Sequence, residues 1–177
     1  LSQHRTQVHG TIIPGRGQED GLNLNIRTSH IDLAFPTKYT KGIFRDLQGR
    51  ASGWARVFGP FKNVNLEGDM FINEMKMHIL AIGTDYRLAG DSVTLRPDNI
   101  WLRKANIYDN VGAPGMNEHT ATVDAHLMHN AFKHLTYDIS IDAHNLLCYN
   151  FPQQGSMNFF GTAYADAQVH LTGGMKT

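Results

Sequence analysis

The chain has 177 residues, of which 41% are hydrophobic and 18% are charged, with 16 Lys+Arg against 16 Asp+Glu. This composition excludes a disordered chain, and the length is enough for one domain that buries about two thirds of its unfolded surface. The formal net charge of zero argues against nucleic-acid binding as the main function, because phosphate binding requires a surplus of Lys and Arg. The single cysteine, Cys148, excludes an internal disulfide and a cysteine-rich zinc module.

The ends of the chain carry no targeting signal. It begins at Leu1 without the basic and apolar regions of a signal peptide, and its longest apolar stretches, residues 79–82 and 145–149, are too short to span a bilayer. We therefore expect a segment of a larger protein, with any signal or membrane anchor outside this sequence.

Alternation of apolar and polar residues is the main structural signal. Residues 135–144 alternate without exception, which places every apolar side chain on one face of a strand. Turn residues separate the alternating runs at 59–60, 89–91, 96–98 and 112–115. In chain order, the pattern predicts strands at residues 8–13, 22–27, 52–58, 64–72, 75–82, 84–88, 92–96, 99–103, 120–127, 135–144 and 160–171.

Helical periodicity is weak by comparison. Residues 125–134 come closest to a 3.6-residue period, but no window of twelve or more residues combines that period with caps at both ends. The sequence therefore predicts an all-β chain in which long strands follow one another as an antiparallel meander.

A faint internal repeat supports this organisation. Residues 53–70 contain the pattern V-x-L-x-G-x-M after a short strand, and residues 161–175 contain it again with a turn three residues shorter. Such recurrence suggests a β-structure that grows by adding strands. We expect residues 1–177 to be a single segment of a larger repetitive β-domain.

Catalytic motifs are absent from the sequence. There is no Gly-x-Ser-x-Gly elbow, no His-Glu-x-x-His and no Walker loop, and the glycines at 15–21 indicate a turn and not a dinucleotide site. Asp138 and Asp142 fall on the same side of one strand and are typical of a solvated face. We predict no enzyme activity and no cofactor.

The ten histidines are the one compositional oddity. If this segment were a helix, His126 and His129 would lie on one face at a spacing suited to binding a metal ion. On a strand, they point to opposite sides. We therefore interpret the cluster near Asp124 as polar surface and predict no metal. The histidines assigned to outward or turn positions are His30, His119, His126, His129, His134, His144 and His170.

A family resemblance follows from the order of several short motifs. Residues 57–68, VFGPFKNVNLEG, resemble the repeat of the TamB family, the translocation and assembly module proteins of the Gram-negative envelope. Residues 91–95, 107–109, 132–138 and 160–165 are similar to motifs that Bacteroides-type members carry in the same order. The match covers residues 22–173, and its specificity comes from the sequence of weak motifs.

The resemblance implies a fold and a function. It implies a long, open, taco-like β-groove in the periplasm, in a protein anchored in the inner membrane by a segment absent here and bridging to the outer membrane. It also implies phospholipid transport and the assembly or secretion of outer-membrane proteins, with an outer-membrane barrel partner of the TamA/BamA kind and neighbouring repeats of the same chain. No catalytic residues come with the family.

The alternation identifies the residues that would line such a groove. An acyl chain of fifteen methylenes gains about 12 kcal/mol on leaving water, so a conduit must be about as apolar as the bilayer. The same residues would serve equally as the sealed core of a β-sandwich. The predicted lining is Val64, Leu66, Met70, Ile72, Met77, Ile79, Leu95, Val123, Leu127, Leu135, Tyr137, Ile139, Ile141, Val169 and Leu171.

Two other functions stay open at this point. A closed cell-surface β-sandwich would bind glycans or protein through an exposed platform built on Trp54 or Trp101. A jelly-roll enzyme or metal protein would use the histidine cluster, and metal would then stabilise its fold.

Overall fold

The computed structural model describes residues 5–15, 20–34, 44–109, 120–130, 133–153 and 159–174. These residues form ten strands and no helix, so the all-β prediction is confirmed, and no helix in these ranges could span a membrane. The strands are β1 (Thr6–Ile13), β2 (Gly21–Ala34), β3 (Phe44–Gly59), β4 (Asn65–Ile79), β5 (Thr84–Leu88), β6 (Asp91–Arg96), β7 (Asn99–Tyr108), β8 (Ala121–Asn130), β9 (Lys133–Phe151) and β10 (Gly161–Gly174).

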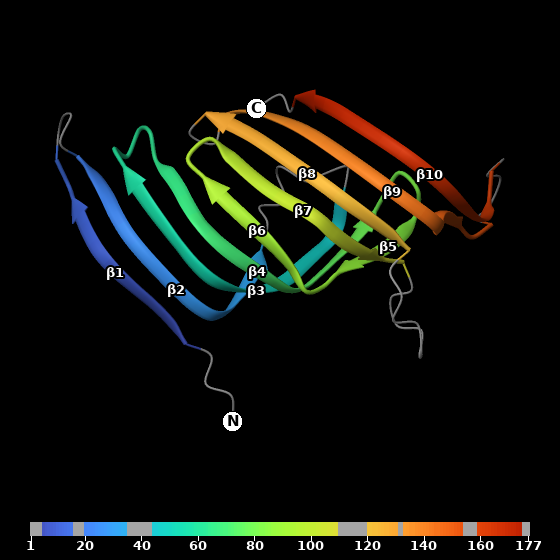
Figure 1. Cartoon of the computed structure of the whole chain (residues 1–177), viewed down its shortest axis with the longest axis horizontal. Helices are drawn as coiled ribbons and strands as arrows, with labels where there is room; N and C mark the ends of the chain where they lie inside the picture. Colours follow the sequence, from blue (N-terminus) through green and yellow to red (C-terminus); the bar gives the residue numbers. More distant parts are fainter. Residues whose placement is uncertain are drawn as a thin grey trace.

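All ten strands belong to one antiparallel sheet. Its order is β1-β2-β3-β4-β5-β7-β8-β9-β10, and β6 pairs with β4 and β7. Figure 1 shows the strands side by side across one curved sheet, with β1 and β10 at opposite ends. Each of these two end strands pairs with a single neighbour, and no second sheet is present in the described part of the chain.

The strands β4, β5, β7 and β6 close a small ring of pairings. Residues 75–79 of β4 pair with β5, residues 68–72 of β4 pair with β6, and both short strands also pair with β7. The predicted turn at 89–91 is therefore an interruption between two strands that lie end to end along β4. Gly90 supplies the left-handed conformation there, with φ of 82°.

The register explains why two strands were predicted where one forms. Residues 64–72 and 75–82 were expected to be separate, but β4 runs without a break from Asn65 to Ile79. A register shift opposite Arg50 and Ala51 inserts one unpaired residue into β4, after which the alternation resumes in the opposite phase. A bulge therefore looks like a strand boundary when only the sequence is read.

Other expectations about elements also change. Residues 125–134, the nearest approach to a helix, lie in β8 and β9 as far as they are described. The two segments of the internal repeat differ in structure, because residues 53–70 form the β3–β4 hairpin whereas residues 161–174 form the single strand β10. The predicted turn at 112–115 lies outside the described residues.

Aspartate side chains hold two bulges in place. Lys104 and Asn145 have positive φ, 47° and 50°, so their backbone N–H groups leave the regular ladder. The Lys104 N–H donates to Asp124 Oδ1 at 3.1 Å, and the Asn145 N–H donates to Asp166 Oδ1 at 2.7 Å. Each carboxylate comes from the neighbouring strand and satisfies a donor that the sheet itself cannot pair.

The buried core is small and lies in the middle of the sheet. Leu88, Ala105 and Val123 form its centre, and the half-buried hydrophobic residues Met75, Met77, Leu102, Ile107, Ala125, Ile139 and Ile141 pack around them. The described strands form one sheet with no second layer of described residues over it, so burial is confined to the middle of this sheet.

Candidate functional site

An apolar face runs across the whole sheet. Residues that pair directly in neighbouring strands have their side chains on the same face of the sheet. Leu66 pairs with Val57, and Leu127 pairs with Tyr137, so each pair lies on one face. All of the predicted lining residues except Val64 lie in strands on this one face, which we call the apolar face; Val64 immediately precedes β4. They are Leu66, Met70, Ile72, Met77, Ile79, Leu95, Val123, Leu127, Leu135, Tyr137, Ile139, Ile141, Val169 and Leu171.

Exposure of the apolar face increases from the middle of the sheet towards its C-terminal edge. Ile72, Leu95 and Val123 are 4%, 9% and 8% exposed, and Val123 packs with Leu88 and Ala105 in the core. On β10, Val169 and Leu171 are 38% and 47% exposed. The apolar face is therefore sealed at its centre and reachable from solvent at this end.

The apolar face also extends to strands that the sequence prediction left out. Val8 of β1 pairs with Ile26 of β2, and Ile12 pairs with Leu22, so their side chains continue the same surface. Val8 and Ile12 are 54% and 60% exposed. The alternation at residues 22–27 carried this signal, and it could have extended the predicted lining by two strands.

Two glycines on this face allow close approach between β3 and β4. Gly53 and Gly68 have φ of 140° and 156°, conformations that residues with a Cβ rarely adopt. A Cβ at Gly53 would overlap the Asp69 carbonyl oxygen, and one at Gly68 would overlap the Trp54 carbonyl oxygen. The absence of side chains here lets the two strands coil tightly and keeps this part of the apolar face shallow.

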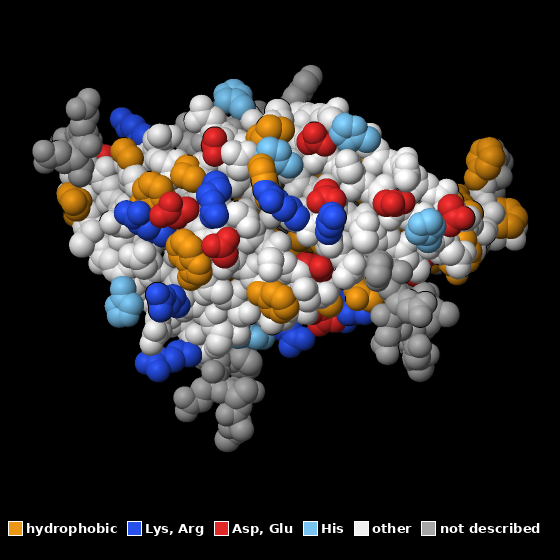
Figure 2. All heavy atoms as spheres, in the orientation of Figure 1, with side chains coloured by type: hydrophobic (Ala, Val, Ile, Leu, Met, Phe, Trp, Pro, Cys, Tyr) orange, Lys and Arg blue, Asp and Glu red, His pale blue; other side chains and the backbone are white. Residues whose placement is uncertain are grey.

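The opposite face is polar and carries both signs of charge. Cross-strand ion pairs join Arg50 to Glu74 at 2.9 Å and Arg56 to Glu67 at 3.1 Å. The face turned towards the viewer in Figure 2 shows Lys, Arg, Asp and Glu side chains interspersed with single apolar ones. A sheet with one apolar and one charged face has only the first available for apolar ligands.

Three hydrogen bonds close one end of the sheet. The Tyr86 hydroxyl donates to the Leu147 carbonyl at 2.7 Å, and the Leu147 N–H donates to Asp109 Oδ2 at 2.6 Å. The Asn150 N–H donates to the Ile82 carbonyl at 2.9 Å. These contacts, which we call the clasp, fasten the part of β9 that extends past β8 to the β4–β5 turn and to β5.

The histidines are not brought together as a metal site. His126 packs edge-on against the Trp101 ring, with 4.8 Å between ring centroids, and its imidazole hydrogen-bonds Asn99. His129 was expected at the surface but is only 6% exposed, because its end of β8 is held against the Asp98 carbonyl by a 2.9 Å backbone hydrogen bond. Burial lowers the pKa of His129 below its usual 6.5.

No group of three or more His, Cys, Asp or Glu side chains within the described ranges could hold a metal ion. His134, His144 and His170 are exposed as predicted, His30 is half-buried, and His119 lies outside those ranges.

The site is thus a surface for apolar contact and carries no assembled reactive groups in the described residues. Two carboxylates, Asp91 and Asp109, are buried at 7% and 5% exposure, and each accepts a backbone N–H, from Asn106 and Leu147 respectively. This arrangement is suited to holding extended apolar chains or neighbouring strands. No family model, no curated protein and no solved structure matches this chain.

Proposed function

We propose that this chain is a periplasmic, non-enzymatic segment of a TamB-like bridge between the inner and outer membranes. Its apolar face would form an open β-groove that takes phospholipid acyl chains and assists the assembly or secretion of outer-membrane proteins. The observation that carries the proposal is one apolar face, continuous over a single curved sheet and exposed on β1 and β10. The proposed partners are an outer-membrane barrel of the TamA/BamA type and neighbouring repeats.

The energetics of an acyl chain favour an open surface of this kind. Fifteen methylenes gain about 12 kcal/mol on leaving water, and the bilayer offers nearly the same gain. A conduit must offer the acyl chain about the same free-energy gain as the bilayer and no more, so that the chain can both enter and leave. A surface of Val, Ile, Leu and Met side chains, half-exposed on β10 and without a deep apolar pocket among those described, meets both conditions.

The edges of the sheet support a role with neighbouring or client strands. Neither β1 nor β10 contains a Lys or a Pro, the residues that commonly protect a free edge from pairing. An extended segment could add to either edge through main-chain hydrogen bonds and continue the apolar face.

Lipid extraction combined with native mass spectrometry tests the proposal. Leu171→Asp and Val8→Asp place a charge on the apolar face at half-exposed positions, where folding should survive. Phe71→Asp is the matched control, because Phe71 is 41% exposed but its pairing with Ser52 places it on the polar face. We expect phospholipid to co-purify with the unaltered chain and the control, and to be reduced in the two test variants.

Two results would overturn this function. A protein that carries no lipid and takes up none from phospholipid vesicles would show that the apolar face is not a conduit. Equal lipid loss in Phe71→Asp would show that the bound lipid is not held by the apolar face. The closed-sandwich binding module has less support, because all described strands belong to one sheet and Arg103 covers the Trp101 ring at 3.8 Å. Its other platform residue, Trp54, is 41% exposed.

A further inference from the structure

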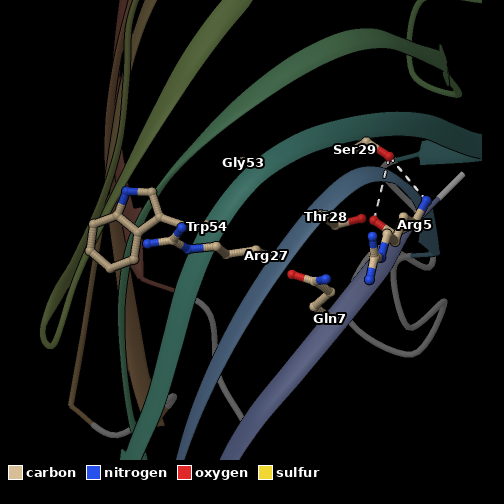
Figure 3. A pocket seen from close by; sticks show the side chains of 7 residues that line it. All are labelled: Arg5, Gln7, Arg27, Thr28, Ser29, Gly53 and Trp54. Carbon is tan, nitrogen blue, oxygen red and sulfur yellow. Dashed lines mark hydrogen bonds between the residues drawn. The ribbon is translucent and has the colours of Figure 1, made fainter.

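A recess of about 530 Å³ lies on β1, β2 and β3, away from the proposed groove. Figure 3 shows the side chains around it, with the Arg27 guanidinium directed towards the Trp54 ring and Arg5 on the far side of Gln7. A volume of this size is in the range of small-molecule sites, which run from about 300 to 1,000 Å³. Its lining residues are Arg5, Gln7, Arg27, Thr28, Ser29, Gly53 and Trp54.

The register puts the key side chains on the polar face. Gln7 pairs with Arg27, and Arg27 pairs with Trp54, so the three side chains form one row across three strands. Their neighbours Val8 and Ala55 alternate to the apolar face. The recess is therefore lined mainly by side chains of the polar face, and it reaches Thr28 and Gly53, whose positions alternate to the apolar face.

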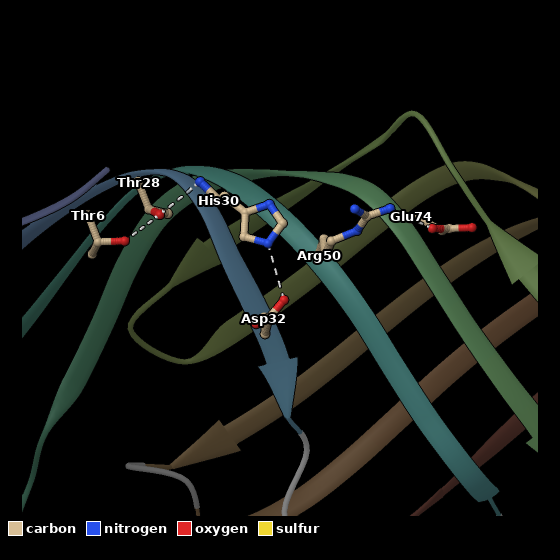
Figure 4. A network of polar contacts seen from close by, with 6 residues as sticks. All are labelled: Thr6, Thr28, His30, Asp32, Arg50 and Glu74. Carbon is tan, nitrogen blue, oxygen red and sulfur yellow. Dashed lines mark hydrogen bonds and ion pairs between the residues drawn. The ribbon is translucent and has the colours of Figure 1, made fainter. Parts of the chain in front are cut away.

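The recess carries two positive charges and no carboxylate among its lining residues. Arg50 and Arg56 on the same face are paired with Glu74 and Glu67 (Figure 4 shows the first pair). The Arg27 guanidinium, in contrast, has no ion pair or hydrogen bond with any described residue. An unpaired guanidinium beside a recess is a ready donor for an anion.

The second arginine is held in position from both sides. The Arg5 N–H donates to Ser29 Oγ at 3.0 Å, and with the Gln7 amide oriented to accept, the Arg5 guanidinium donates to it twice at 3.0 Å. The hydroxyl of Thr28 is already engaged by Thr6 at 2.8 Å and by the His30 N–H at 3.1 Å (Figure 4). Because two nitrogens of the Arg5 guanidinium already donate to Gln7, the main donor left for a ligand is the Arg27 guanidinium.

Asp69, the acidic residue opposite Trp54, does not cancel this charge. Asp69 pairs with Trp54 on the side away from Arg27, and its carboxylate lies 3.9 Å from the Arg96 guanidinium. Trp54 itself is 41% exposed, so its ring offers a flat apolar surface next to a cationic group. Aromatic faces of this kind stack on sugar rings, and a guanidinium binds phosphate through two parallel hydrogen bonds.

We propose that this recess binds a phosphorylated saccharide of one or two rings. Arg27 binds the phosphate, Trp54 stacks on the sugar ring, and Arg5 on the other side of Gln7 adds positive charge to the recess. The anion supplies the charge complement that the lining lacks, and the ring covers the exposed indole. A phosphate alone would leave the indole ring uncovered, and a neutral sugar alone would leave the two cations without a counter-charge.

Isothermal titration calorimetry at low salt tests the proposal with three probes: glucose 1-phosphate, inorganic phosphate and glucose. We expect glucose 1-phosphate to bind most tightly, by about tenfold over either of the other two. Arg27→Gln and Trp54→Ala should each weaken it by about tenfold or more. Arg56→Gln is the matched control, because it removes an equivalent charge from the same face outside the recess and should leave binding unchanged.

Each other outcome contradicts the proposal. Equal binding of phosphate and glucose 1-phosphate, unaffected by Trp54→Ala, would mean a simple anion site. Equal loss in Arg27→Gln and Arg56→Gln would mean a general effect of surface charge. No heat with any probe at millimolar concentration would mean that the recess does not bind a phosphorylated saccharide. Circular dichroism of each variant, and Trp54→Phe as a milder change, separate loss of binding from loss of fold.

Discussion

Removing one hydroxyl from the clasp should loosen a defined part of the sheet. Tyr86 is 6% exposed, and its hydroxyl donates at 2.7 Å to the carbonyl of Leu147, a residue 61 positions away in the chain. Tyr86→Phe keeps the ring and its packing but leaves a carbonyl without its donor. Loss of a buried hydrogen-bond partner costs about 1–3 kcal/mol, a large share of the roughly 5–15 kcal/mol that stabilises a domain.

The effect should be concentrated in the second half of β9. The pairing of β8 with β9 ends at Ala121 and Ala143, and one further backbone bond joins the His144 N–H to the Thr120 carbonyl, so the rest of residues 144–151 depends on β10 and on the clasp. Urea unfolding followed by circular dichroism should show the loss of stability, and hydrogen exchange should be faster at residues 144–151 than elsewhere. Tyr164→Phe is the matched control, because Tyr164 is 54% exposed and should change neither measurement.

High pH gives a second test of the same contact. Burial raises the pKa of Tyr86 above its usual 10.0, with the charge of Asp109 contributing. The folded state therefore holds this proton more tightly than the unfolded state, so the stabilisation is complete below pH 10 and is lost as the pH rises through the folded-state pKa. Tyr86→Phe should remove that decline. Unchanged urea midpoints and unchanged exchange at residues 144–151 would refute the reasoning.

Three further outcomes follow from the structure. Burial lowers the pKa of His129 below 6.5, so its contribution to stability should be lost as the pH falls through the folded-state pKa. In His129→Phe, the urea midpoint should therefore depend less on pH between pH 7 and 5 than in the unaltered chain. The same pH dependence in both proteins would contradict this. Gly53→Ala should cost about 1–3 kcal/mol in urea unfolding, because its Cβ overlaps the Asp69 carbonyl at φ of 140°. Asp124→Ala should speed hydrogen exchange at the Lys104 amide and cost about 1 kcal/mol; equal exchange rates would show that the bulge holds without it.

The sequence alone predicted the all-β class and many of the residues on the apolar face, but not those of β1 and β2. Successive side chains of a strand point to opposite faces, so the face of one residue determines the face of its neighbours along the strand. Ile139 and Ile141 could therefore be assigned to one face without knowing which strands pair with them. Resemblance to a family added the proposed function, which remains a prediction.

Bulges limited how far the alternation could be followed. At β4 the phase changes after Ile72, and the resumption at Met75 was read as a new strand. At β8, His129 was assigned to the surface because it is polar, although it alternates in phase with Val123 and Leu127; it is buried, and its N–H is held by the Asp98 carbonyl. The bulge in β4 depends on its pairing with β3, which the local pattern does not contain.

The alternation by itself determined that the chain is a β-protein with one apolar and one polar face, because side-chain direction in a strand depends only on position along it. Only the tertiary structure decided how deeply each part of the apolar face is buried, since that depends on the curvature of the whole sheet. It also decided that Tyr86 reaches Leu147, and that Arg5, Arg27 and Trp54 meet around one recess. Such contacts join residues far apart in the chain, and they form only when the strands adopt a common register.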